Sequence, residues 1–370
     1  MSTSRLVPIP LLLLLAAACS DTTAPPPSAS GESALQGTAA GSGAQRVVVM
    51  TQNLFVGADV DAVLLALQTP DPDDDFPSLL SAIQTLERTD FPSRAAALAA
   101  QIDRYRPHAV GLQEVSIIQI VLPPFGLDIQ LDFLPILQQA LAARGLNYQV
   151  AAQVQNLDAS PAPGVRLIDF DVLLVDATRV TVNSSAGHNF TNNLGPIGPG
   201  VTLIRGWVEA EVTIGGSAYT IASTHPEPDL GGNSFPLLRA AQVGEILTSL
   251  GSTSPAIVIG DLNDEPGSPM YQLLRQADFT DVWAALRPGV VGYTCCHATD
   301  LSDRLPDFDE QVDYVFTRGF GHANRPVLGR ITRIGMLPSD RVAGPLGSIW
   351  VSDHAGIVAT LLLPPGGSRN

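Results

Sequence analysis

The sequence predicts an α/β fold in which strand–helix units and hairpins occur in one body. Short apolar runs rich in β-branched residues alternate with amphipathic stretches of helical length, a pattern typical of α/β proteins. The pair Gly215-Gly216 separates two such runs as the turn of a hairpin would. Hydrophobic residues make up 45% of the 370 residues and charged residues 15%, which is ample apolar content for a core. Hairpins mixed with strand–helix units argue against a purely parallel sheet.

Composition excludes several classes of protein. Three cysteines are too few for a disulfide scaffold of this length, and one apolar stretch alone approaches a bilayer span, so a multipass membrane protein is excluded. The formal net charge is −16, and the fixed positive charges are all arginines. An acidic chain repels phosphate backbones at long range, which counts against a general nuclease.

The N-terminus is predicted to be a targeting segment. Arg5 precedes an apolar run over residues 6–18, and Pro8 and Pro10 interrupt that run, as expected for a secretory signal rather than a membrane span. The residues before Cys19 resemble the lipobox of bacterial lipoproteins, although Ala16 stands where leucine is usual. This resemblance implies cleavage before Cys19, lipidation of Cys19 and, with Ser20 following, an outer-membrane location. An ordinary cleaved signal is the alternative.

The rest of the chain divides into a tether, a body and a tail. Residues 20–45 are rich in Ser, Thr, Ala, Gly and Pro and predict a flexible tether, and residues 365–370 predict a tail. Without an internal repeat or a break in composition, residues 46–364 predict one domain. Within it, Ser93 is expected to cap a helix over 94–106 that Pro107 ends, and a second helix is expected over 237–250. Strands are predicted over 47–51, 109–115, 170–175, 208–213, 219–223, 256–259, 312–316 and 357–362.

Polar residues stand at the ends of the predicted strands. They are Asn53, Glu114, His225, Asp261, Asn263, Asp313, Asp353 and His354. Each is an ordinary turn or cap residue when taken alone. As a set they must pair, bind a metal or face a cleft, because a buried unpaired charge is costly. Hard oxygen ligands suit Mg²⁺, Mn²⁺ or Ca²⁺, and a His beside an Asp suits a general base. The set therefore predicts metal-assisted hydrolysis, with phosphate esters as the natural substrate.

The order of these motifs resembles the endonuclease/exonuclease/phosphatase superfamily. The resemblance is carried by Asn53, Gln113-Glu114, Thr224-His225, Gly260-Asp261-Leu262-Asn263, Asp313-Tyr314 and Ser352-Asp353-His354, and it spans nearly the whole body. It implies a two-sheet α/β sandwich with helices outside and a site at one end of the sheets. The Thr224-His225 element resembles the deoxyribonuclease and sphingomyelinase branches.

The resemblance also implies a role for each residue. Glu114 would be the principal Mg²⁺ ligand, helped by Asn53 and Asp353. His354 would act as the base on water, oriented by Asp313. Asp261 and Asn263 would polarise the phosphate region or the nucleophile, and His225 would contact a phosphate oxygen or assist the leaving group.

Several segments stay open at this point. Asp169 and Asp171 either end a strand or reach the cleft, and the structural role is favoured. Cys295 and Cys296 either form a vicinal disulfide, remain thiols, or bind a metal with His297. The acidic run Asp71–Asp75 is taken as a solvated loop rather than a Ca²⁺ site. The stretches 58–91, 117–131 and 187–200 carry no readable motif, although the choice of substrate is expected to depend on them.

The sequence as a whole predicts an exported, lipid-anchored, Mg²⁺-dependent phosphodiesterase. Its partners would be a phosphodiester (a lipid head group, a small molecule or a nucleic acid) and the membrane that holds the anchor. A nuclease acting on DNA or RNA is the first alternative, and a surface binding protein without catalysis is the second.

Overall fold

The computed structural model describes residues 45–66, 69, 71, 73–198, 200–230, 233–321 and 327–363. The predicted signal, Cys19, the tail and all of the tether except Gln45 lie outside the described residues. Gln45 already belongs to the first strand of the described residues. Among the described residues, none of the helices is both long and apolar enough to cross a membrane.

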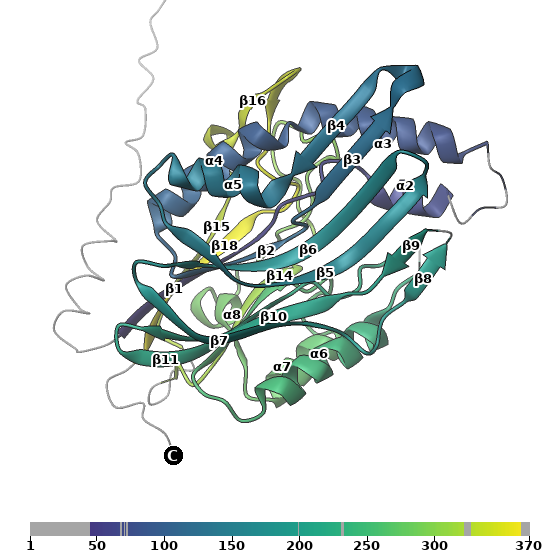
Figure 1. Ribbon diagram of the computed structural model, residues 1–370. Coiled ribbons are helices and arrows are strands. Elements are labelled where there is room, and N and C mark those ends of the chain that lie inside the picture. The colour runs from purple at the N-terminus through teal and green to yellow at the C-terminus, as the bar shows by residue number, and fades with distance from the viewer. Residues whose placement is uncertain are drawn as a thin grey trace, which may run out of the picture. The chain divides into compact units, whose positions relative to one another are not determined.

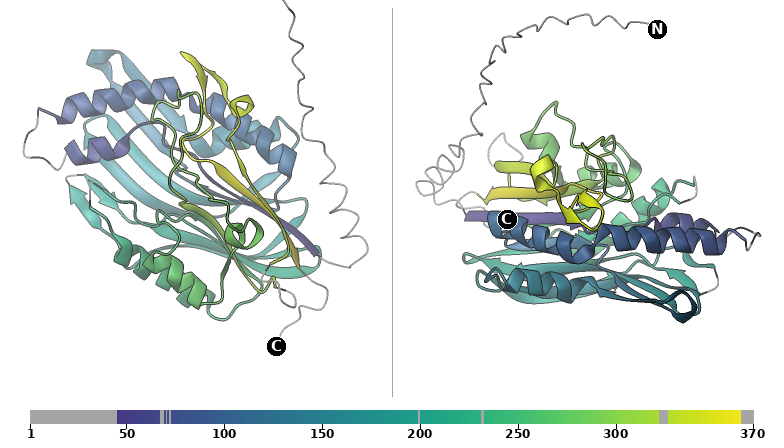
Figure 2. Two further views of the ribbon diagram at one scale, coloured as in Figure 1. Left: turned by 180° about the vertical axis from the view of Figure 1, so that it is seen from behind. Right: turned by 90° about the horizontal axis from the view of Figure 1, so that it is seen from above.

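Two large sheets face each other in the described part of the chain (Figures 1 and 2). The first runs in the order β15-β18-β1-β2-β6-β5-β9-β8, and the hairpin β3–β4 joins it along β6. Its strands are β1 (Gln45–Asn53), β2 (Ala109–Gln113), β3 (Ile117–Leu122), β4 (Leu127–Asp132), β5 (Tyr148–Ala162), β6 (Val165–Asp176), β8 (Gly195–Gly198), β9 (Val201–Leu203), β15 (Gly329–Ile334) and β18 (Gly356–Leu363).

The second sheet has the order β13-β14-β12-β11-β10-β7. It consists of β7 (Val180–Asn189), β10 (Gly206–Ile214), β11 (Ser217–Thr224), β12 (Ala256–Asp261), β13 (Thr280–Asp281) and β14 (Asp313–Arg318), and a small hairpin of β16 (Val342–Gly344) and β17 (Gly347–Ile349) stands apart. The β10–β11 pair is the hairpin that Gly215-Gly216 predicted, with Ile214 opposite Ser217. The mixture of parallel and antiparallel pairs confirms that the fold is not purely parallel.

Helices cover the outer faces of both sheets (Figure 1). Helices α3, α4 and α5 lie over the first sheet, whereas α6 and α7 lie over the second. The helices are α2 (Val60–Ala66), α3 (Asp75–Thr89), α4 (Phe91–Tyr105), α5 (Phe133–Ala142), α6 (Pro236–Leu250), α7 (Pro269–Gln276) and α8 (Val282–Leu286), with 3₁₀ turns η1 (Pro123–Phe125) and η2 (Pro338–Asp340). The predicted two-sheet sandwich with outer helices is confirmed.

The alternation of side chains along β1 explains the layers. Val47 and Val49 point into the core between the sheets, whereas Val48 and Met50 point into the core beneath the helices. A strand whose two faces are both covered must be apolar throughout, which is why this run is continuous rather than alternating. Each fully buried side chain of this size contributes about 1.5–3 kcal/mol relative to exposure.

The structure corrects two local predictions. Helix α4 begins at Phe91, and Ser93 lies inside its first turn with its Oγ donating to Asp90 Oδ2 at 2.5 Å, so Ser93 is not the cap. The three stretches without motifs are also more ordered than loops. They contain α2 and α3, nearly all of the β3–β4 hairpin, the end of β7 and the whole of β8. In the acidic run that was expected to be a loop, Asp75 is the first residue of α3.

A buried histidine gives the fold a pH dependence. His108 Nδ1 accepts the Val48 N–H at 2.9 Å, and burial, reinforced by Arg179, lowers the pKa of His108 to about 4. In the unfolded chain the histidine takes up a proton below about pH 6.5, whereas in the folded protein it stays neutral down to about pH 4. The stability that neutral His108 contributes is therefore fully present above pH 6.5 and is lost as the pH falls toward 4. We expect the unfolding free energy of wild type relative to His108→Gln to fall by about 2 kcal/mol between pH 7 and 4.5. Urea titrations at both pH values measure it, and a difference that does not change with pH would contradict it.

Candidate active site

The predicted polar residues meet at one edge of the two sheets because of strand direction. β1 runs parallel to β2, and β11 runs parallel to β12, so the residues at or just after their carboxyl ends share an edge. β14 and β18 run antiparallel to their neighbours and bring their amino ends to the same edge. The edges touch, because Asn53 Nδ2 on one sheet donates to Asp261 Oδ2 on the other at 3.0 Å.

His354 and Asp313 form a buried dyad. His354 Nδ1 lies 2.8 Å from Asp313 Oδ2, and His354 is 8% exposed. Burial by itself lowers the pKa of His354, but the carboxylates of Asp313, Asp261 and Asp353 outweigh it and raise the pKa well above its ordinary value. The contact through Nδ1 leaves Nε2 for other partners, which is the arrangement of an oriented general base.

Asp261 lies between the two histidines of the site. Its Oδ2 is 3.5 Å from His225 Nε2 and 3.8 Å from His354 Nε2, and its Oδ1 accepts the Asn263 N–H at 3.0 Å. Burial raises the pKa of Asp261 to about 6, with His354 opposing the shift and Asp313 adding to it. Asn263 donates its side-chain amide to Pro226 O at 3.0 Å, which fixes the turn after β12.

Glu114 directly follows β2 in a left-handed conformation with φ 56°. This region is uncommon for a residue with a Cβ, and such outliers gather at functional sites. The Glu114 carboxylate accepts from Asn53 Nδ2 at 3.0 Å and from the Val56 N–H at 2.8 Å. Asn53 therefore bridges Glu114 and Asp261, while its own Oδ1 accepts the Phe55 N–H at 2.8 Å.

The carboxylates of Glu114 and Asp353 fit a divalent cation. Burial and then the neighbouring Asp353 raise the pKa of Glu114, and burial also raises the pKa of Asp353. Arg94 lies near both, but its guanidinium donates to the carbonyls of Thr89, Leu54, Val351 and Phe55. Two neighbouring, half-buried carboxylates are the kind of donor set that Mg²⁺ or Mn²⁺ prefers. Such an ion would also offset the charge that raises the pKa of His354.

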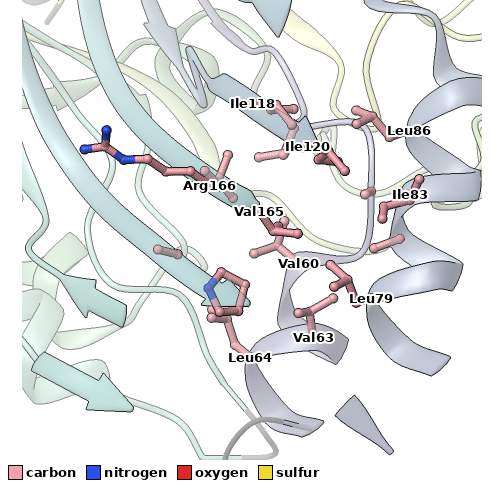
Figure 3. A pocket seen from close by; sticks show the side chains of 16 residues that line it. Val60, Val63, Leu64, Leu79, Ile83, Leu86, Ile118, Ile120, Val165 and Arg166 are labelled. Atoms are coloured by element: carbon pink, nitrogen blue, oxygen red, sulfur yellow. The ribbon is translucent and has the colours of Figure 1, made fainter. Parts of the chain in front are cut away.

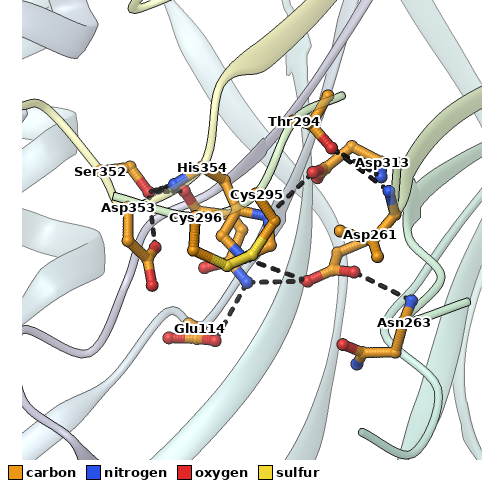
Figure 4. The surroundings of a disulfide bond; sticks show 12 residues. Glu114, Asp261, Asn263, Thr294, Cys295, Cys296, Asp313, Ser352, Asp353 and His354 are labelled. Carbon is orange, nitrogen blue, oxygen red and sulfur yellow. Dashed lines mark hydrogen bonds and ion pairs between the residues drawn. A yellow bond between two sulfur atoms is a disulfide. The ribbon is translucent and has the colours of Figure 1, made fainter. Parts of the chain in front are cut away.

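The segment Thr294–His297 makes hydrogen bonds to the two chain segments that carry Asp313 and His354 (Figure 4). Thr294 Oγ1 accepts the N–H groups of Val312 and Asp313 at 3.3 and 3.2 Å. The His297 N–H donates to Asp353 O, and the Ala355 N–H donates to Thr294 O, both at 2.8 Å. Cys295 and Cys296 form a vicinal disulfide, the first of the alternatives, so neither offers a thiolate to a metal. Cys296 Sγ lies 4.0 Å from His354 Nε2.

A cleft of about 280 Å³ opens beside these residues. Glu114, Asp353, Asp169 and Cys296 line it, together with Arg205, the one arginine among its described lining residues. Sequence reasoning missed Arg205. The available signal was a lone charge between the apolar runs of β9 and β10, but nothing local shows that this charge faces a cleft.

Asp169 and Asp171 require a correction. Neither ends a strand, because β6 continues through both to Asp176, and Asp169 lines the cleft. Burial, with Glu114 nearby, raises the pKa of Asp169 to about 7, and its Oδ1 accepts from Ser116 Oγ at 3.0 Å. Asp171 Oδ1 lies 4.0 Å from His225 Nδ1, so it belongs to the surroundings of the site rather than to a strand end.

Arg205, which lines the cleft, lies against His225. Arg205 Nη1 is 3.1 Å from His225 Nδ1, and its Nε is 3.8 Å from the buried carboxylate of Glu227. Burial, then Arg205 and His354, lower the pKa of His225 well below its ordinary value. A neutral His225 beside a fixed guanidinium is suited to binding an anionic oxygen, because the positive charge comes from Arg205.

Comparison with known proteins agrees with this architecture. The sequence matches no curated protein at a significant level. Solved structures of similar fold include an endonuclease/exonuclease/phosphatase family protein from Bacteroides thetaiotaomicron, with 13% identity, a TM-score of 0.56, and 88% of this chain and 99% of that one covered. The human nocturnin catalytic domain with bound sulfate has 17% identity, a TM-score of 0.51, and 85% and 93% coverage. Humanized D. rerio TDP2 has 18% identity, a TM-score of 0.50, and 85% and 98% coverage.

At these identities the structural matches establish the fold alone. The family itself follows from the sequence, since the sequence model of the Endonuclease/Exonuclease/phosphatase family matches residues 50–354, most of the chain and all of the strand-end residues described above. On this evidence the chain belongs to the Endonuclease/Exonuclease/phosphatase family.

Proposed function

We propose that this protein is a divalent-metal-dependent phosphodiesterase. Its family hydrolyses phosphoesters with divalent metals, and nucleases and phosphatases are both among its members. The observation that carries the proposal is the His354–Asp313 dyad next to the carboxylates of Glu114 and Asp353, which line the cleft. Export and lipidation of Cys19 rest on the N-terminal sequence and are part of the same proposal.

The residues divide into two groups by role. Glu114 and Asp353, with Asn53 beside them, would hold the metal, which when bound supplies a Lewis acid for a phosphoryl oxygen. His354 takes a proton from the attacking water at Nε2, and Asp313 keeps the ring oriented and stabilises the imidazolium. As the water oxygen bonds to phosphorus, the bond from phosphorus to the leaving oxygen breaks. The Arg205–His225 side of the cleft holds a non-bridging oxygen or the leaving oxygen.

A direct assay tests this function. Metal-free protein is incubated with bis(p-nitrophenyl) phosphate with and without Mg²⁺ or Mn²⁺, and release of nitrophenol is followed. We expect turnover that depends on the metal. Absence of turnover with either metal, together with the absence of metal binding by calorimetry, would refute the proposal. Plasmid nicking under the same conditions separates a nuclease from a hydrolase of smaller diesters.

Arg205 gives a prediction about substrate binding. Replacing it with Leu removes the guanidinium that faces the cleft and leaves Glu227 buried without its nearest cation. Hydrogen bonds to charged groups contribute about 1.5–3 kcal/mol, so we expect kcat/KM for the diester to fall roughly 10- to 150-fold. Arg205→Lys should restore part of this loss by keeping the charge. An unchanged kcat/KM in Arg205→Leu would show that the phosphate binds elsewhere.

A further inference from the structure

Figure 3 shows an apolar pocket that shares lining residues with the cleft. Its volume is about 70 Å³, and its walls come from α2, α3, β3 and β6 through side chains such as Val63, Leu64, Ile83, Leu86, Ile118 and Val165. Arg166 is the charged residue on the described wall, but its guanidinium pairs with Asp158 at 3.0 Å. The pocket therefore offers a ligand neither charge nor hydrogen bonds.

The pocket and the cleft share a wall. Val56, Ala58, Val60, Leu64 and Leu167 line both cavities. Val56 connects them most closely, because its N–H donates to Glu114 Oε2 at 2.8 Å while its side chain faces the pocket. A phosphate bound in the cleft beside the proposed metal ligand Glu114 would thus lie near this apolar pocket.

Two exposed aromatic side chains lie on α3 and on the β3–β4 hairpin, which contribute to the walls of the pocket. Phe76, in the first turn of α3, is 45% exposed, and Phe125, at the tip of the β3–β4 hairpin, is 58% exposed. Their ring centroids are 5.3 Å apart. These two rings add exposed apolar surface to α3 and to the β3–β4 hairpin, both of which also contribute residues to the pocket.

We propose that the pocket receives an aliphatic chain attached next to the phosphate of the substrate, which makes that substrate a lipid-type phosphodiester. This inference rests on the proposed function. An apolar cavity of about 150 Å³ can bind benzene, so the smaller pocket accepts the first few carbons of a chain rather than a whole tail. A nucleoside would leave the donors and acceptors of its base and sugar unpaired there, which is costly.

The test uses soluble alkyl p-nitrophenyl phosphates from methyl to hexyl, below their micelle concentrations, with the metal-loaded full chain. Burial of one methylene is worth about 0.8 kcal/mol, which corresponds to about fourfold in affinity. We therefore expect kcat/KM to rise two- to fourfold per carbon until the pocket is full.

A substitution at Ala82, which lines the pocket from α3, tests the assignment by filling part of the pocket with a larger side chain. Ala82→Leu should remove the dependence on chain length while leaving the methyl diester unaffected. Gln84→Leu adds the same side chain on the exposed side of α3 and should behave as wild type.

The outcomes separate this inference from the function on which it rests. Equal kcat/KM for methyl and hexyl diesters in the wild type would overturn the pocket assignment and leave the phosphodiesterase standing. Absence of turnover for every diester, together with the absence of metal binding, would refute the proposed function. In that case, calorimetry with hexyl and methyl phosphate decides the pocket: tighter binding of hexyl phosphate, lost in Ala82→Leu, supports it, and equal binding overturns it.

Discussion

The variant His354→Ala is expected to fold normally and to hydrolyse phosphodiesters at least about 10²-fold more slowly than wild type. The reason is geometric. His354 Nδ1 is engaged by Asp313 at 2.8 Å, so Nε2 is the nitrogen that can take a proton from water, and alanine removes it. Steady-state kinetics should show the loss in kcat, with KM changing little, because the proton transfer belongs to the transition state.

Two further variants make the result specific to the dyad. Asp313→Asn should also lower kcat, and the double variant should lose little beyond His354→Ala, since residues that act as a unit are strongly non-additive. His188→Ala, which changes a partly exposed histidine on β7, is the matched control and should keep wild-type kinetics. Wild-type kcat in His354→Ala, with the same urea unfolding midpoint, would remove His354 from the mechanism.

The second large effect concerns Glu114. Glu114→Gln should lower turnover by at least about 10²-fold and abolish stabilisation of the protein by Mg²⁺, because the charge that attracts the cation is gone. In wild type, a ligand at about 100 times its Kd adds about 2.7 kcal/mol to the unfolding free energy. Without metal at neutral pH, the variant should have an unfolding free energy at least as high as that of wild type, because burial and Asp353 make the charged form of Glu114 costly.

Thermal unfolding with and without Mg²⁺ measures this effect independently of activity. Glu87→Gln, on the exposed side of α3, is a control that removes one negative charge away from the cleft and should retain the metal-dependent rise in Tm. If Glu114→Gln responds to Mg²⁺ as wild type does, the ion binds at other carboxylates and Glu114 has another role.

The outline of the site was predictable because its residues obey a simple rule. Glu114, His225 and Asp261 each stand at or just after the end of a buried strand, and parallel strands bring such positions to one edge. The apolar runs of β1, β12 and β18 were equally readable, since both of their faces are covered. Both the core strands of the sheets and the polar residues at the strand ends could therefore be predicted from the sequence.

The remaining features depend on contacts that no local pattern reveals. Arg205 enters the cleft because β9 and β10 bring it beside His225, and the sequence around it shows neither contact. Asp169 and Asp171 alternate with apolar residues in β6 as solvent-facing residues would, yet their side faces the site. The β3–β4 hairpin was missed although both of its strands alternate between more and less buried residues, most regularly in β4.

The pairing of β1 with β18 determines when, during synthesis of the chain, the candidate site can form. These are the first and last strands of the described chain, and Ser352 Oγ donates to Asn53 O at 2.7 Å across 299 residues of sequence. Contacts this distant in sequence form late, because long loops must close before they are made. A nascent chain that ends before Asp353 lacks His354 of the dyad and one of the proposed metal ligands. The complete site can therefore form only after almost all of the described chain has been synthesised.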